Sequence, residues 1–179
     1  LGEESDQVLT VLSSVKGAVG RFELILPGSK ITAIVDYAHT PDALKNVLET
    51  IAQFRTGTEQ VIAIVGCGGN RDKTKRPLMA SIACRFSDKV VLTSDNPRDE
   101  EPMAIIKEMQ TGIGPSDARK TVVIADREEA IKMACMMAKE KDIVLVAGKG
   151  HETYQEIKGV KYPFDDREVV ERMLKLFNN

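Results

Sequence analysis

The sequence has no tryptophan, and aromatic residues make up only 4% of its 179 residues. A folded core must therefore be built from aliphatic side chains, as in parallel β-sheets that helices cover on both faces. No apolar run approaches the roughly 20 residues of a membrane span, and the first residues lack the basic start and apolar core of a signal peptide. We expect no membrane partner and a cytoplasmic location.

Cysteine and histidine are also scarce. The three cysteines, Cys67, Cys84 and Cys135, form no CxxC pattern, which argues against a disulfide framework or a zinc site. The two histidines, His39 and His151, have no carboxylates at metal-ligand spacing. We predict no metal site built from this chain alone.

No excess of one charge is present. With 25 Lys and Arg against 27 Asp and Glu, the formal net charge is -2, and no segment gathers the basic residues that a nucleic-acid backbone requires. Nucleic acid is therefore an unexpected partner. The length and the 42% hydrophobic content fit one compact domain with a short appendage.

Short β-branched runs alternate with helical patterns, which is typical of βαβ units. These runs cover residues 22–26, 31–35, 61–65, 90–93, 121–125 and 143–147. Only four residues separate the first two runs, so they should form an antiparallel hairpin. If Leu26 pairs with Ile31, Arg21 lies opposite Asp36. We predict an α/β three-layer sandwich with a mostly parallel six-stranded sheet, one antiparallel strand, and a small hairpin that turns at Lys158-Gly159.

Helix-start signals mark five helices, at Thr40-Pro41, Pro77, Pro102, Asp126 and Asp166. The apolar side chains expected on their buried faces include Leu78, Met103, Met133 and Phe177. A further amphipathic segment at residues 5–15 reads as the last helix of a preceding domain. The alternative is a helix that packs on this same domain.

Polar segments follow several of the predicted strands: DYAHTPD (36–42), GCGGNRDKTKR (66–76), SDNPRDE (94–100) and GKGHE (148–152). In open α/β sheets, ligands bind outside the carboxyl ends of the parallel strands. All these segments therefore share one edge of the sheet, and the N-terminal hairpin brings Arg21 to the same edge.

The glycine-rich segment does not match a phosphate-binding fingerprint. Both GxxxxGK[ST] and GxGxxG fail, which disfavours a self-sufficient triphosphate site and a dinucleotide oxidoreductase. The segment is either a tight strand-to-helix turn or a backbone approach to a ligand, with Arg71 as a fixed cation.

The DNPR segment, residues 95–98, places a carboxylate, an amide and a guanidinium within four residues. Arg98 offers the planar fork that binds a carboxylate bidentately. The alternative is an ordinary turn with a surface arginine. Glu152 can bind an ammonium group, or merely face Lys149 in its own loop.

In this order and spacing, DYAHTPDAL, GCGGNRDKTKRP, SDNPRDEEP and AGKGHETYQ resemble the C-terminal domain of the Mur ligases, over roughly residues 17 to 179. DNPR is similar to the signature of members that add meso-diaminopimelate. The resemblance implies a Rossmann-like sheet and an ATP-dependent amide ligase that works through an acyl phosphate. It implies addition of meso-diaminopimelate to UDP-MurNAc-L-Ala-D-Glu in peptidoglycan synthesis, with ATP and Mg²⁺ bound mainly by a central domain.

The resemblance also assigns candidate site residues. Those that match the diaminopimelate contacts are Arg71, Asp95, Asn96, Pro97, Arg98, Gly148 and Glu152. Arg21 and Asp36, with His39 close by, match positions that contact ATP, and Arg21 would stabilise charge on the transferring phosphoryl group as a catalytic residue. The alternative is a cross-strand ion pair between Arg21 and Asp36 without catalytic consequence.

The sequence departs from the family pattern because the P-loop is absent. We expect residues 1–16 to be a helix and linker from a central ATPase domain, and residues 17–179 to be the C-terminal domain. The partners would then be the N-terminal and central domains of the same polypeptide. Two alternatives stay open: a related amide ligase of the folylpolyglutamate or cyanophycin synthetase type, and a stand-alone ligand-binding module.

Overall fold

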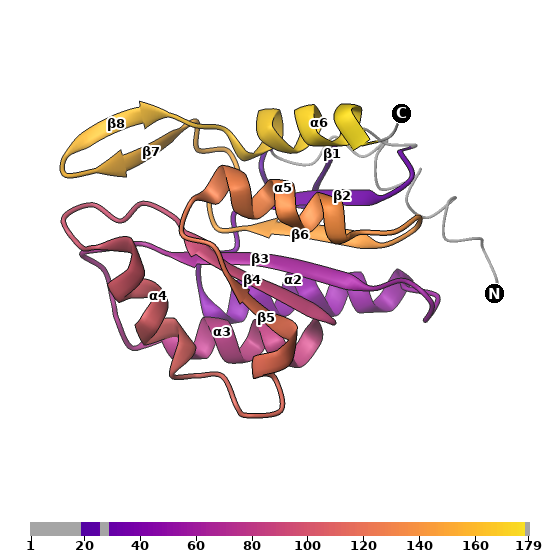
Figure 1. Cartoon of the computed structure of the whole chain (residues 1–179), viewed down its shortest axis with the longest axis horizontal. Helices are drawn as coiled ribbons and strands as arrows, with labels where there is room; N and C mark the ends of the chain where they lie inside the picture. The colour runs from indigo at the N-terminus through magenta and orange to yellow at the C-terminus, as the bar shows by residue number, and fades with distance from the viewer. Residues whose placement is uncertain (1–18, 26–28, 178–179) are drawn as a thin grey trace.

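The computed structural model describes residues 19–25 and 29–177, which fold as a six-stranded sheet between two helical layers (Figure 1). The predicted segment at residues 5–15 lies outside the described residues, as does Leu26. The sheet strands are β1 (Glu23–Ile25), β2 (Thr32–Asp36), β3 (Val61–Cys67), β4 (Lys89–Ser94), β5 (Thr121–Val123) and β6 (Ile143–Ala147).

The strand order is β1-β2-β6-β3-β4-β5, and β1 pairs antiparallel with β2 while all other pairings are parallel. The central strands β3 and β6 are buried along their whole length, which explains their unbroken aliphatic sequences. The predicted fold class is confirmed.

Helices cover both faces of the sheet. They are α2 (Pro41–Phe54), α3 (Lys75–Phe86), α4 (Pro102–Gln110), α5 (Arg127–Met137) and α6 (Asp166–Phe177), with a 3₁₀ turn at Ala118–Lys120. Side chains of Val61, Ala63 and Val65 join the core under α2, α3 and α4, whereas Ile62 and Ile64 join the core under α5 and α6. Figure 1 shows α5 and α6 in front of the sheet and α2 and α3 behind it. The strand period of two thus divides one sheet between two cores.

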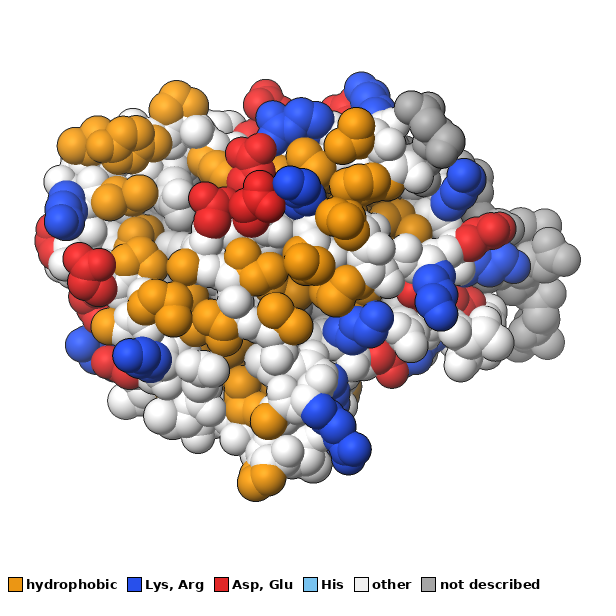
Figure 2. Space-filling model, viewed as in Figure 1, with side chains coloured by type: hydrophobic (Ala, Val, Ile, Leu, Met, Phe, Trp, Pro, Cys, Tyr) orange, Lys and Arg blue, Asp and Glu red, His pale blue; other side chains and the backbone are white. Residues whose placement is uncertain are grey.

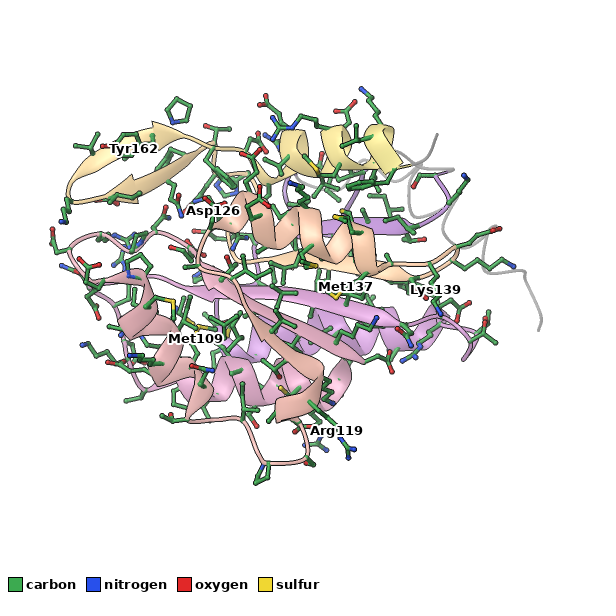
Figure 3. All side chains as sticks on the ribbon, in the orientation of Figure 1. Met109, Arg119, Asp126, Met137, Lys139 and Tyr162 are labelled. Carbon is green, nitrogen blue, oxygen red and sulfur yellow. The ribbon has the colours of Figure 1, made fainter. Side chains whose placement is uncertain are left out.

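Two helix starts follow their sequence signals. Thr40 Oγ1 accepts a hydrogen bond from the Ala43 N–H (3.3 Å), with Pro41 as the first helical residue of α2. Asp126 Oδ1 accepts from the Glu129 N–H (2.9 Å) at the amino end of α5 (Figure 3). Both predictions are confirmed.

The prediction for α3 was wrong in start and in rotation. The helix begins at Lys75 rather than Pro77, and Leu78 is 54% exposed. The cause is Arg76, which is fully buried and directs its guanidinium to Glu100 and Glu108. This buried polar contact turns Met79 and Ala83, not Leu78, into the core.

Three other side chains assigned to buried faces are exposed instead: Met103, Met133 and Phe177. In α4 the neighbouring Ile105 is buried, and in α5 Ile131 and Cys135 are buried. In these short helices of mixed composition, several rotations bury a similar apolar area, so packing against the sheet decides between them.

The predicted register of the N-terminal hairpin was off by one residue. Glu23 pairs with Val35 and Ile25 pairs with Ala33, so the same count puts Phe22, not Arg21, opposite Asp36. The Phe22 N–H donates to Asp36 Oδ2 (2.7 Å). Among the described residues, Arg21 and Asp36 form no ion pair within 4.0 Å.

The C-terminal hairpin pairs β7 (Tyr154–Ile157) with β8 (Val160–Pro163) through a turn at Lys158 and Gly159. Both turn residues have positive φ (49° and 77°), as a two-residue hairpin turn requires. This prediction is confirmed. The hairpin projects beyond the sheet, and Figure 2 shows hydrophobic side chains over it. Val160 and Tyr162, both in β8, are half exposed.

A buried ion pair joins α5 to α6. Arg127 Nε and Nη2 donate to the two carboxylate oxygens of Asp166, both at 2.8 Å, and both side chains are fully buried. The same guanidinium donates to the carbonyls of Ser94 (3.2 Å) and Ala147 (3.0 Å), at the ends of β4 and β6.

Within the described ranges, no helix combines the length and the apolar character that crossing a membrane demands.

Removing the carboxylate of this pair should destabilise the fold strongly. Asp166→Ala leaves Arg127 buried without its counter-charge, and we expect a loss of about 3 to 5 kcal/mol in the free energy of unfolding. Glu171→Ala, which breaks an exposed pair with Lys175 on the same helix, should cost less than about 1 kcal/mol. Urea denaturation measures both changes, and equal losses in the two variants would contradict the prediction.

Candidate functional site

The polar segments that follow β3, β4 and β6 meet in one pocket of about 490 Å³ at the carboxyl edge of the sheet. Six of the seven residues predicted for diaminopimelate line it, namely Arg71, Asp95, Asn96, Arg98, Gly148 and Glu152, and so does His39, which was predicted for the nucleotide. Pro97 does not line this pocket but a neighbouring cavity on the side of α5. The structure therefore brings together cationic and anionic side chains that are up to 81 positions apart in the sequence, from Arg71 to Glu152.

Asn96 connects the loops around the pocket. Its side chain is buried, and its Oδ1 accepts from Lys149 Nζ (3.0 Å) and from the Glu156 N–H (3.0 Å). Its Nδ2 donates to Glu152 Oε2 (2.8 Å), and its carbonyl accepts from the Gly69 N–H (2.9 Å). One residue thus joins the glycine-rich loop, the 148–152 loop and β7.

Glu152 contacts Lys149, which was the predicted alternative to its binding an ammonium group. Lys149 is fully buried, and its Nζ lies 3.2 Å from Glu152 Oε2. The bonds from Lys149 and Asn96 both use Oε2, and among the described residues Oε1 accepts no hydrogen bond. The contact with Lys149 therefore leaves one carboxylate oxygen of Glu152 for a ligand.

Arg98 is held in an uncommon backbone conformation, with φ at 51°. Its Nη1 donates to the Gly69 carbonyl (2.9 Å), and its Nε lies 3.2 Å from Glu156 Oε2. A Cβ on residue 68 would lie 2.9 Å from Nη1, so a glycine at position 68 gives the guanidinium its room.

Arg71 and Lys75 add positive charge to the lining of the pocket. Arg71 is exposed and forms no ion pair with any other residue that the structure describes. Lys75 Nζ donates to the His39 carbonyl (2.8 Å). The pocket can thus offer cations to a carboxylate and an anion to an ammonium group.

A second cavity of about 450 Å³ adjoins the first and contains Arg21, Asp36 and His39, the residues predicted for a nucleotide. Both oxygens of Asp36 are occupied, because they accept from the N–H groups of Phe22 and Ala38, each at 2.7 Å. Burial raises the pKa of the Asp36 carboxyl, while these two hydrogen bonds and the charge of Arg21 partly offset the rise. Asp36 therefore also fixes the local backbone.

Tyr37 stands between the two cavities, since it lines both. Its ring centroid lies 4.5 Å from that of His39 and 4.8 Å from that of His151. Tyr37 was not among the predicted site residues, although its place directly after a predicted strand was a usable signal.

The comparison with protein families identifies the domain. Residues 20–150 match the family described as Mur ligase, glutamate ligase domain. The chain belongs to the Mur ligase family. The UDP-N-acetylmuramoyl-L-alanyl-D-glutamate--2,6-diaminopimelate ligase of Cytophaga hutchinsonii is 62% identical over 97% of this chain, and the protein of that name from Phocaeicola vulgatus is 57% identical over 95%.

A solved structure supports the same family assignment. A structure of a UDP-N-acetylmuramoyl-L-alanyl-D-glutamate--2,6-diaminopimelate ligase superimposes with a TM-score of 0.83 at 44% identity, over 93% of this chain and 33% of that one. The chain spans 36% of the length of the Cytophaga hutchinsonii relative and 35% of the Phocaeicola vulgatus relative.

In the described ranges, no three His, Cys, Asp or Glu side chains are placed to hold a metal ion. Cys67 and Cys135 are buried, and burial raises the pKa of each thiol to about 12. Buried thiols of this kind are poor nucleophiles at neutral pH.

The loops of the Mur ligase pocket are attached to the fold through Arg76. Its Nη2 donates to the Gly68 carbonyl (3.2 Å) and to Glu100 Oε1 (2.9 Å), and Glu100 also accepts from the Asn70 N–H (2.6 Å). The bonds from Arg76 and Asn70 lower the pKa of Glu100 from 4.5 to about 2. Glu100 thereby links the DNPR segment to the glycine-rich loop.

This contact predicts a pH dependence of stability. Because the pKa of Glu100 is lower in the folded state, its stabilisation is complete above about pH 4.5 and is lost as the pH falls toward 2. We expect the free energy of unfolding to fall less steeply over this range in Glu100→Gln than in the wild type. Denaturant titrations at a series of pH values test this, with Glu171→Gln as the control. Identical slopes for wild type and Glu100→Gln would refute the assignment.

Proposed function

We propose that the chain is the C-terminal, amino-acid-binding domain of an ATP-dependent amide ligase that adds meso-diaminopimelate to UDP-MurNAc-L-Ala-D-Glu. The observation that carries the proposal is the convergence of Arg71, Arg98 and Glu152 on one pocket. The printed names of the relatives at 57% and 62% identity, diaminopimelate ligases, support the same substrate.

The charges of the pocket suit the far end of this amino acid. That end is a zwitterion, so its carboxylate needs a cation and its ammonium needs an anion or a carbonyl. Arg71 and Arg98 supply the first, while Glu152 and the Gly148 backbone supply the second. Asp95 and Asn96 complete the wall between them. Each such charge-assisted hydrogen bond contributes about 1.5 to 3 kcal/mol.

Asp95 and Gly148 are closely fitted. Gly148 has φ at 121°, and a Cβ on this residue would lie 2.7 Å from Asp95 Oδ2. Only glycine accommodates both the backbone conformation and the carboxylate. In our proposal the Gly148 backbone, which lines the pocket, contacts the ligand. Pro97 contributes by stiffening the DNPR loop rather than by contact.

The adjoining cavity fits part of a nucleotide. Arg21 offers a cation for phosphate groups, and apolar side chains such as Phe22 and Val47 form a wall. We assign Arg21, Asp36 and His39 to ATP, with Arg21 stabilising negative charge on the transferring phosphoryl group. The carboxylate of the UDP-MurNAc-dipeptide would attack the γ-phosphorus of ATP, which forms an acyl phosphate and releases ADP. The amine of diaminopimelate would then attack the acyl carbon, which forms the amide and releases phosphate.

The remaining parts of such an enzyme would come from a longer polypeptide. In this proposal residues 17–179 form the C-terminal domain and residues 1–16 lead from a central domain. N-terminal and central domains would bind UDP-MurNAc-dipeptide, Mg²⁺ and most of ATP, since the sequence contains no P-loop and the described residues present no metal site.

Arg98 should discriminate between the two ligands of this domain. We expect Arg98→Ala to weaken meso-diaminopimelate binding about 10- to 100-fold, as loss of one charged hydrogen-bonding group implies, and to leave ATP binding unchanged. Calorimetry on the chain measures both affinities. Arg119→Ala removes an exposed arginine on the 3₁₀ turn, far from the hairpin in Figure 3, and serves as the control.

Equal effects of Arg98→Ala on both ligands would count against the proposed site. Binding of ATP without diaminopimelate would favour a related amide ligase of the folylpolyglutamate or cyanophycin synthetase type. Diaminopimelate binding by a native polypeptide of only this length would favour a stand-alone module.

The chain by itself should not catalyse amide formation. Because it contains no P-loop, we expect no phosphate release above background from ATP, meso-diaminopimelate and UDP-MurNAc-L-Ala-D-Glu. A phosphate-release assay checks this, and turnover by the 179-residue chain would refute it.

A further inference from the structure

The β7–β8 hairpin is attached to the DNPR loop through Arg98. The Arg98 N–H donates to the Glu156 carbonyl (3.0 Å), and the Lys158 N–H donates to the Arg98 carbonyl (2.8 Å). Arg98 and Ile157 form an isolated parallel bridge. These bonds hold the positive-φ conformation of Arg98, which a non-glycine residue rarely adopts.

A side chain of the hairpin also holds the guanidinium. Glu156 Oε2 lies 3.2 Å from Arg98 Nε, on the side of the group that faces β7. Nη1 is fixed by the Gly69 carbonyl at 2.9 Å. The hydrogen bond from Nη1 and the ion pair at Nε together restrict the plane of the guanidinium, and among the described residues Nη2 donates no hydrogen bond.

We propose that Glu156 is a positioning residue for Arg98, and that it sets how well the pocket recognises the distal carboxylate of its amino acid. This inference rests on the function proposed above. A carboxylate that meets a guanidinium bidentately requires a defined plane. Ordering that plane before binding lowers the entropic cost of the complex.

Glu156 has a second, opposing effect, because its negative charge reduces the attraction of Arg98 for a carboxylate. The half-buried pair, with side chains 26% and 20% exposed, is partly screened by water. Water does not screen the effect of Glu156 on the orientation of the Arg98 guanidinium. We therefore expect positioning to outweigh charge, and the sign of the change in affinity tests this.

The experiment measures binding of meso-diaminopimelate to the chain by NMR titration. Glu156→Ala removes the whole carboxylate side chain from the ion pair with Arg98, and should weaken binding about tenfold. Glu156→Gln keeps the length of the side chain and an oxygen beside Arg98 Nε, and should stay within about threefold of the wild type. Lysine, which has no distal carboxylate, should bind all three proteins alike.

A second readout needs no ligand. The NMR signal of the Arg98 Nε–H, identified by its absence in Arg98→Lys, should be protected from exchange with water in the wild type and in Glu156→Gln. It should lose that protection in Glu156→Ala. Glu171→Gln removes one carboxylate from an exposed pair on α6 and controls for net charge.

The outcomes separate the two proposals. If Glu156→Ala binds diaminopimelate as well as or more tightly than the wild type, the positioning role is overturned while the proposed function stands. If the wild type does not bind diaminopimelate, the proposed function fails. In that case the Nε–H signal still decides whether Glu156 orders Arg98, and equal protection in wild type and Glu156→Ala would overturn that too.

Discussion

The arrangement of the pocket depends on the hydrogen bonds of one buried amide, that of Asn96. Its oxygen accepts from the Lys149 ammonium and the Glu156 N–H, and its nitrogen donates to Glu152. The carboxamide has one acceptor atom and one donor atom. Its oxygen therefore binds the two donors, and its nitrogen binds the Glu152 carboxylate. A carboxylate in its place would face Glu152, and an aliphatic side chain would leave the buried Lys149 with one partner fewer. The convergence of loops distant in sequence therefore follows from the polarity of a single side chain.

Beneath this network, two buried guanidinium groups fix the bases of the loops. Arg127 donates to the carbonyls of Ser94 and Ala147, where β4 and β6 end, and is neutralised by Asp166. Arg76 does the same for the Gly68 carbonyl, with Glu100 as its counter-charge. Buried ion pairs add little net stability compared with well-packed apolar residues. Their effect here is geometric, because they bind carbonyls at the ends of β4 and β6 and in the glycine-rich loop.

Local signals predicted the parts of the fold that local interactions determine. The strands follow from β-branched runs, and α2 follows from Thr40 and Pro41. The rotation of α3 was not predictable in this way, because it depends on Arg76 meeting Glu100, 24 residues later. The hairpin register failed for a similar reason: Asp36 is bonded by the Phe22 N–H, and Phe22 adopts a positive φ that no turn signal announces. In the pocket, the charged residues at strand ends were found, whereas Lys149 and Glu156 were missed as pocket determinants, because their roles lie in contacts with Asn96 and Arg98.

Lys149 and Glu156, the ion-pair partners of Glu152 and Arg98, affect how strongly the pocket should discriminate between amino acids. In the structure, Glu152 is paired with Lys149 and Arg98 is paired with Glu156. Sites whose polar group is left wholly unpaired reject an analogue by roughly 10⁴-fold or more. Under the proposed function, lysine would leave Arg98 with Glu156 as a partner, so this residue alone should discriminate less than that. Arg71 has no ion-pair partner among the described residues, and its desolvation by a ligand without a distal carboxylate would be uncompensated. Discrimination between diaminopimelate and lysine would then require both arginines. Arg98 would orient the distal carboxylate, and Arg71 would provide a positive charge that no other residue described in the structure neutralises.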